Sequence, residues 1–133
     1  MKILGVDHIG IAVNKIDDSY PKYQKGFGLS LEKTEFIPDK NLKIGFLDMG
    51  NIHIELIEPT SADSTIAKFI EKRGPGIHHF CILVDNIEES LAQFKNIGYE
   101  MIDSCPRQGA AGSKIAFVHP GSFDGVLIEL KQI

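Results

Sequence analysis

Two histidines and two glutamates stand at matching places in the two halves of the chain. His8 aligns with His79 at an offset of 71 residues, and Glu55 aligns with Glu129 at an offset of 74. Imidazole nitrogens and carboxylate oxygens are side-chain donors that hold divalent cations. The duplicated pattern therefore predicts a metal site with these four residues as ligands.

The segments around these residues repeat as well. Val6–Ser19 is echoed by Ile77–Ser90, and Asn51–Leu56 is echoed by Gly125–Leu130. Each half thus opens with a strand that carries a histidine and closes with a strand that carries a glutamate. An internal duplication of this kind indicates two modules of the same design.

The spacing of apolar residues predicts the elements of each module. In the first, alternation from Ile3 to Val13 predicts a strand, helical spacing follows from Asp17 to Gly28, and a hairpin joins strands at 42–48 and 52–58. The second is expected to have a strand at 77–84, a helix with Ile87, Leu91, Phe94 and Ile97 on its buried side, and strands at 101–103, 114–119 and 126–131.

These elements predict an α+β fold in which two tandem βαβββ modules form one cupped, mixed sheet around the metal site. We expect a single domain with module one at 1–59, a connector at 60–75 and module two at 76–133. The connector contains a short capped helix, 64–73. Its length allows the modules to pair within one chain, although the sequence leaves pairing between chains open.

Period-two geometry predicts where the four ligands point, because alternate side chains of a strand lie on opposite faces. Ile9, Ile11 and Val13 are expected to pack on a helix, so His8 points the other way, beside small residues that leave room for a ligand. Taken singly, such a histidine is more often a satisfied core residue, and a glutamate near a strand end is usually solvated. The joint pattern favours metal binding, because a carboxylate between apolar neighbours must be paired when it is buried.

Composition limits the class of protein. The chain has 133 residues, 43% hydrophobic and 24% charged, with a formal net charge of −4. It has no block of basic residues, which argues against nucleic acid or a membrane surface as partner. Two cysteines make no disulfide framework and no targeting segment is evident, so a cytoplasmic location is expected.

Other polar residues give weaker signals. His78 is expected to be a packed residue, and His53 is either a neighbour of the ligands or simply exposed. Lys114, His119 and Ala111, the last in a loop of small residues at 109–112, are candidate substrate contacts. The alternatives are ordinary ones: solvated charge, a strand-end cap and a plain loop.

The chain resembles the vicinal oxygen chelate superfamily, also called the glyoxalase superfamily, and within it the methylmalonyl-CoA epimerases. The resemblance covers essentially the whole chain. The stretches that carry it are Asp7–Val13, Gly50-Asn51, Ile54–Pro59, Ser64–Phe69, Gly76–His79, His119-Pro120 and Gly125–Leu130.

The resemblance implies an isomerase that interconverts (R)- and (S)-methylmalonyl-CoA by removing a proton through a metal-stabilised enolate. It implies that His8, Glu55, His79 and Glu129 hold Co²⁺, with Ni²⁺, Mn²⁺ or Zn²⁺ as other possible ions, and that the protein is a homodimer. Glu129 is implied as one acid/base group. Some epimerases use a glutamate on the strand matching 42–47, where this chain has Lys43-Ile44-Gly45, so Glu55 or a water molecule would have to serve as the second group.

Two alternatives stay open. A lactoylglutathione lyase of the same superfamily would show the same order of ligands, although the His119-Pro120 context favours the epimerase. A metal-free small-molecule-binding module of this fold would typically have lost the ligands.

Overall fold

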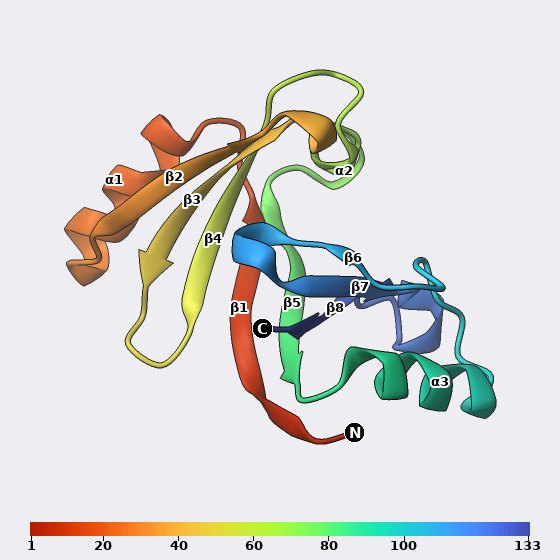
Figure 1. The fold of residues 1–133 in the computed structure, drawn as a ribbon. Helices are drawn as coiled ribbons and strands as arrows, with labels where there is room; N and C mark the ends of the chain where they lie inside the picture. Colours follow the sequence, from red (N-terminus) through yellow and green to blue (C-terminus); the bar gives the residue numbers. More distant parts are fainter. The chain divides into compact units, whose positions relative to one another are not determined.

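The computed structural model describes residues 1–133 and contains the predicted βαβββ order twice (Figure 1). In the first half, the elements are β1 (Ile3–Ala12), α1 (Ile16–Phe27), β2 (Leu31–Ile37), β3 (Leu42–Asp48) and β4 (His53–Pro59). The connecting helix is α2 (Thr65–Arg73). The second half has β5 (Gly76–Val84), α3 (Ile87–Ile97), β6 (Arg107–Gln108), β7 (Lys114–Val118) and β8 (Ile128–Gln132).

The chain divides into two compact units. The first unit is His8–His78, and the second unit combines Met1–Asp7 with His79–Ile133. Strand β1 contributes to both. Strand order is β2-β3-β4-β1 in the first unit and β1-β5-β8-β7-β6 in the second, in a mixed sheet, which confirms the predicted fold class.

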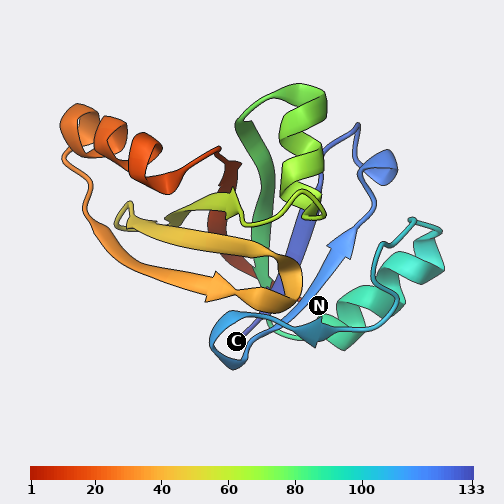
Figure 2. The ribbon, with the colours of Figure 1, turned by 90° about the horizontal axis from the view of Figure 1, so that it is seen from above.

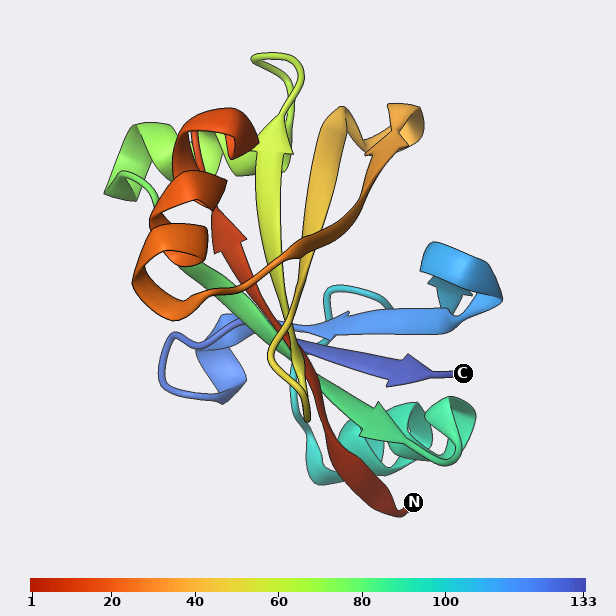
Figure 3. The same ribbon diagram turned by 90° about the vertical axis from the view of Figure 1, so that its left-hand side faces the viewer.

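Helix α1 covers one face of the first unit's sheet (Figure 3). Its first residue, Ile16, is buried together with Val13, Leu47 and Leu56, and Tyr20 and Tyr23 pack against them. The helix ends at Gly28, whose φ of 69° is the left-handed conformation that glycine adopts without steric cost. Predicted helix-facing residues Ile11 and Val13 do pack on this side.

Helix α2 covers part of the opposite face. Ser64 caps it by accepting a hydrogen bond from the backbone N–H of Ile66 (3.1 Å). Ile66 is then buried against Ala12, Ile44 and Ile57. Ala12 lies on the same face of β1 as His8 because the two residues are an even number of positions apart, so α2 packs on the face that carries the predicted ligands.

The second unit buries its own core under α3, which lies beside β7 and β8 (Figure 2). Val84, Ile87 and Leu91 pack against Val118 and Leu130. Asn86 caps the helix by accepting a hydrogen bond from the backbone N–H of Glu89 (3.1 Å). Three apolar clusters, two in the first unit and one in the second, therefore hold the strands that carry the candidate ligands.

Two strands differ from the predictions. The segment predicted as a strand at 101–103 forms only an isolated bridge from Met101 to Val118, and the short strand β6 lies further on at Arg107–Gln108. Strand β2 was not located by the apolar pattern, because charged residues fill this half-exposed edge strand and its alternation is weak. No helix combines the length and the apolar character that crossing a bilayer requires.

Candidate metal centre

In the first unit, His8 and Glu55 form a buried pair. Strands β1 and β4 run parallel, with Gly10 opposite Glu55. The imidazole of His8, two residues before Gly10, reaches the carboxylate with an Nδ1–Oε2 distance of 2.8 Å. Only 4% of His8 and 8% of Glu55 are exposed. Gly10 has no side chain, so no side chain at this position of β1 separates the imidazole from the carboxylate.

The second unit repeats this arrangement with His79 and Glu129. Strands β5 and β8 run parallel, and Cys81 lies opposite Glu129, as Gly10 lies opposite Glu55. Nε2 of His79 is 3.0 Å from Oε2 of Glu129. His79 is 6% exposed and Glu129 is 7% exposed. The rings of His79 and Phe117 meet edge to face, with their centroids 5.5 Å apart. This contact fixes the plane of the imidazole.

Burial makes these pairs costly unless each carboxylate has a cationic partner. A buried carboxylate loses its hydration, and a protonated imidazole or a metal ion at about 3 Å or less can replace it. Every buried side-chain nitrogen and oxygen atom has a hydrogen-bond partner. The pairs thus satisfy the hydrogen-bonding needs of the carboxylates. Their nitrogen and oxygen atoms are also metal donors, and we call the sheet face that carries them the inner face.

The distances within each pair fit neighbouring ligands of one cation. Two donors that each lie about 2.1 Å from an ion, at a right angle, are about 3 Å apart. The separations of 2.8 and 3.0 Å match this value. Each unit contains one nitrogen donor and one carboxylate donor at this spacing. The donor set therefore fits a divalent metal.

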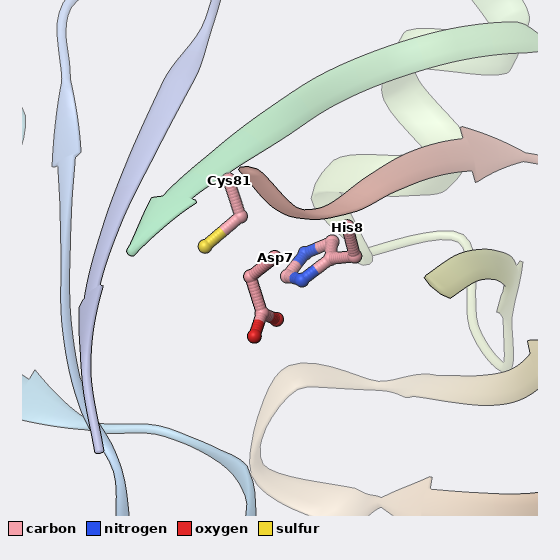
Figure 4. A group of neighbouring side chains, drawn as sticks. All are labelled: Asp7, His8 and Cys81. Atoms are coloured by element: carbon pink, nitrogen blue, oxygen red, sulfur yellow. The ribbon is translucent and has the colours of Figure 1, made fainter. Parts of the chain in front are cut away.

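Asp7 and Cys81 neighbour the ligands along their strands, and neither was singled out by the sequence pattern (Figure 4). Figure 4 shows Asp7 and His8 projecting from β1 and Cys81 from β5. Within the second unit, Asp7 Oδ2 accepts a hydrogen bond from Nζ of Lys131 at 3.0 Å. Cys81 is fully buried. No local pattern pointed to Asp7, because its partner Lys131 lies 124 positions away in the sequence.

The structure places the three candidate substrate contacts in the second unit. Lys114 begins β7 and forms an exposed ion pair with Glu88 (Nζ–Oε1 3.3 Å). His119 precedes the turn at Pro120–Ser122, and its Nδ1 accepts a hydrogen bond from the backbone N–H of Gly121 (2.9 Å). Ala111 has a φ of 54°, so the small-residue loop bends sharply there.

The two remaining histidines of the first unit have other partners. His78 packs edge-on against Phe69, with ring centroids 4.9 Å apart, as expected for a packed residue. His53 is partly exposed and lies 3.5 Å from Glu32 (Nε2–Oε2). Strand pairing puts His53 beside His8, which leaves it next to the candidate ligands.

Residues 7–117 match the family model described as the Glyoxalase/Bleomycin resistance protein/Dioxygenase superfamily. The chain belongs to this glyoxalase superfamily.

Three proteins are similar to this chain over nearly its full length. An uncharacterized protein of Bacillus subtilis, YqjC, is 41% identical over 94% of this chain and 89% of its own. The crystal structure of a hypothetical protein from Bacillus halodurans is 48% identical, with a TM-score of 0.93 over 96% of this chain and 93% of its own. A variant methylmalonyl-CoA epimerase of Streptomyces coelicolor, in complex with 2-nitronate-propionyl-CoA, is 30% identical, with a TM-score of 0.90 over 98% of both chains. The chain is therefore related to enzymes that bind acyl-CoA compounds.

Proposed function

We propose that this protein is a metal-dependent epimerase that interconverts (R)- and (S)-methylmalonyl-CoA by moving the proton at C2. The observation that carries the proposal is the buried histidine–glutamate pair present once in each unit, at 2.8 and 3.0 Å. The similarity to the Streptomyces coelicolor epimerase supports the choice of substrate.

The proposal assigns both pairs to one ion. The chain passes between the units at Asp7–His8 and at His78–His79, so both candidate histidines stand at the crossings. Within the second unit, the backbone N–H of Asp85 donates a hydrogen bond to the carbonyl of Lys2 (3.1 Å), and β1 and β5 run in opposite directions there (Figure 1).

We assign His8, Glu55, His79 and Glu129 to a divalent ion, Co²⁺ being our first choice and Ni²⁺, Mn²⁺ and Zn²⁺ the others. When bound, the ion would polarise the thioester and carboxylate oxygens of the substrate and make the proton at C2 more acidic.

Glu129 is assigned as one acid/base group because its carboxylate stands at the inner face in a buried setting. Positioned acid/base groups typically contribute about 10²–10⁴-fold to a proton transfer. We assign Lys114, His119 and Ala111 to the binding of the remainder of the acyl-CoA. Lys114 and the 109–112 loop lie where β7 begins, and His119 lies where β7 ends.

Deuterium exchange tests the activity directly. Purified protein supplied with Co²⁺ is incubated in D₂O with (S)- or (R)-methylmalonyl-CoA, and deuterium at C2 and the configuration of the product are followed. We expect deuterium to enter C2 and each epimer to yield the other. Glu129→Gln should lower both rates, whereas Glu71→Gln, an exposed residue of α2, should leave them unchanged.

A parallel assay with the hemithioacetal of methylglyoxal and glutathione separates the lyase activity of the same superfamily. Conversion of the hemithioacetal with no deuterium entering methylmalonyl-CoA would overturn the proposal in favour of a lactoylglutathione lyase. Absence of both activities, together with a metal content of zero after purification without chelator, would favour a metal-free binding module.

A further inference from the structure

A second group of metal-binding side chains lies in the first unit. Glu32 and Asp48 each offer a carboxylate oxygen and His53 offers a ring nitrogen, and these three atoms lie within 4.8 Å of one another. None of the three residues belongs to the candidate metal centre. What the group binds therefore does not depend on the proposed function.

Three neighbouring strands supply one residue each. Glu32 is on β2, Asp48 ends β3 and His53 begins β4, and these strands are adjacent in the sheet order β2-β3-β4. Asp48 and His53 are directly opposite each other in the antiparallel β3–β4 ladder, so their side chains project from the same face. This is the inner face, because His53 and Glu55 are two positions apart on β4.

A bulge in β2 brings Glu32 to the same face. Leu31 packs with the residues under α1, on the other side of the sheet, whereas the ammonium group of Lys33 lies over Phe46 on the inner face, 4.9 Å from the ring centroid. Regular alternation would place residues 31 and 33 on one face. The register shifts between them, so Glu32 is the extra residue of a bulge, a feature that re-aims side chains. Its carboxylate reaches across β3 to His53.

The distance between Glu32 and His53 suits two ligands of one ion. Oε2 of Glu32 lies 3.5 Å from Nε2 of His53. A hydrogen bond between such groups is about 2.7–3.2 Å long. Two donors that each lie about 2.0–2.1 Å from a tetrahedral ion are about 3.3–3.4 Å apart. The two side chains are therefore held closer to the spacing of joint metal ligands than to that of a direct hydrogen bond.

Asp48 completes the donor set. Its Oδ1 accepts a hydrogen bond from the backbone N–H of Gly50 (2.7 Å), which orients the carboxylate. A carboxylate has two oxygens, so one can keep this bond while the other coordinates an ion. Two carboxylates balance the charge of a divalent ion, and His53 adds the nitrogen donor that transition metals prefer and that a purely acidic cluster lacks.

The group is open to solvent, unlike the buried pairs. The side chain of Glu32 is 41% exposed and that of His53 is 43% exposed. Water can therefore occupy the remaining coordination position of an ion held there. Three solvent-exposed ligands bind an ion more weakly than four buried ones, because water competes for the ion and screens its charge. Added metal should thus fill this group only after the buried centre.

We propose that Glu32, Asp48 and His53 form a second divalent-metal site, with a preference for Zn²⁺. Imidazole and carboxylate ligands in a tetrahedral arrangement, with water in the open position, are a common zinc environment. The ion ties the edge strand β2 to the two strands beside it, at the end where the β3–β4 hairpin turns.

Counting bound Zn²⁺ tests the site. Each protein is dialysed against saturating Zn²⁺, and the bound metal is measured by atomic emission. We expect His53→Gln to bind one equivalent fewer than wild type, and Glu32→Gln and Asp48→Asn to weaken that equivalent at least about tenfold. His119→Gln is the matched control and should keep every equivalent. His119 is also a partly exposed histidine near a glutamate, with Nδ1 3.7 Å from Oε2 of Glu100, but it belongs to no group of three ligands.

NMR of the histidine rings shows whether the ion binds the imidazole itself. Zn²⁺ should shift the ring nitrogen resonances of His53 and leave those of His119 in place. Wild-type stoichiometry in His53→Gln, or unshifted His53 resonances at saturating Zn²⁺, would overturn the inference. Loss of the equivalent from His53→Gln with full retention in both carboxylate variants would also overturn it. A lost equivalent in His53→Gln, in a protein that exchanges no deuterium into methylmalonyl-CoA, would refute the proposed function and leave this site intact.

Discussion

Oε1 of Glu58 lies 2.7 Å from the backbone nitrogen of Ile16, so a residue at the end of β4 accepts the hydrogen bond of the first N–H of α1. The second unit repeats the contact, because Oε1 of Gln132 accepts from the N–H of Ile87 at 2.8 Å. Lys15, at the N-cap of α1, provides no side-chain cap. The last strand of each module therefore fixes where the helix of that module begins. The same strand carries the candidate glutamate ligand.

Removing this cap should destabilise the protein. We expect Glu58→Ala to lower the free energy of unfolding by about 1 kcal/mol, the usual cost of losing a helix cap. Glu58→Gln should cost less, because the amide oxygen can accept the same hydrogen bond, as Gln132 does. Urea unfolding measures both, with Glu71→Ala as an exposed control that should change stability by less than about 0.5 kcal/mol. Equal losses for Glu58→Ala and Glu58→Gln would mean that the charge at the helix end matters more than the hydrogen bond.

Two glycines of the first unit should respond to alanine with opposite signs. A Cβ at Gly45 would lie 3.1 Å from Ile16 Cγ2 and 3.1 Å from Leu31 Cδ1, whereas a Cβ at Gly26 would meet nothing within 4 Å. We expect Gly45→Ala to destabilise the protein by about 1–3 kcal/mol through overpacking between β3 and α1. Gly26→Ala, inside α1, should stabilise it by about 0.5–1 kcal/mol. Thermal unfolding of the two variants checks the pair, and a stable Gly45→Ala protein would show that α1 can shift away from the sheet.

Asp85 makes stability depend on acid pH. The hydrogen bond from the backbone N–H of Lys2 (N–Oδ1 2.7 Å) lowers the pKa of the Asp85 carboxyl below its ordinary value, and the nearby N-terminal charge adds to this. Because the pKa is lower in the folded state, the stabilisation is complete above the unfolded pKa of about 3.9 and is lost as the pH falls through the folded value. Wild type should therefore lose more stability than Asp85→Asn on acidification below about pH 4. Urea midpoints measured from neutral pH downward test this, and parallel profiles for the two proteins would contradict it.

The sequence was sufficient where a repeat and a short-range period acted together. His8 and His79 sit in clearly alternating strands, so their type, burial and face followed from local pattern, and the βαβββ order followed from the duplication. Local pattern failed for β2, where Glu32, Lys33 and Glu35 interrupt the apolar alternation of an edge strand. The strand predicted at 101–103 was wrong for a related reason. Met101 forms a single bridge to Val118 and packs against the core of the second unit, whereas Ile102 is exposed, so the segment does not extend a ladder.

Contacts between residues far apart in the sequence could not be predicted from the local pattern of residues. The contact of Glu32 with His53 depends on a bulge in the pairing of β2 with β3. The cap of Ile16 by Glu58 joins residues 42 positions apart. Contacts of this kind can be predicted only when the strands are assembled, because the sequence around either residue does not indicate its partner. The candidate site could thus be named from the sequence, but the residues that support it could not.

Loss of one ligand should abolish the effect of metal on stability. In wild type, a divalent ion bound to the folded state and not to the unfolded chain adds about 2.7 kcal/mol at a concentration one hundred times its Kd. We expect Co²⁺ to raise the Tm of wild type and of His119→Ala, whose imidazole accepts a hydrogen bond in a surface turn. His79→Ala should show no rise, because the buried Glu129 loses its partner and the site loses a nitrogen donor. The comparison is made between metal-treated and chelator-treated samples of each variant, so a lower intrinsic stability of His79→Ala does not affect it.

His8→Ala should behave as His79→Ala does if both pairs hold the same ion. A full Co²⁺ response in His8→Ala, with none in His79→Ala, would assign the ion to the second unit alone and would contradict a centre built from both modules.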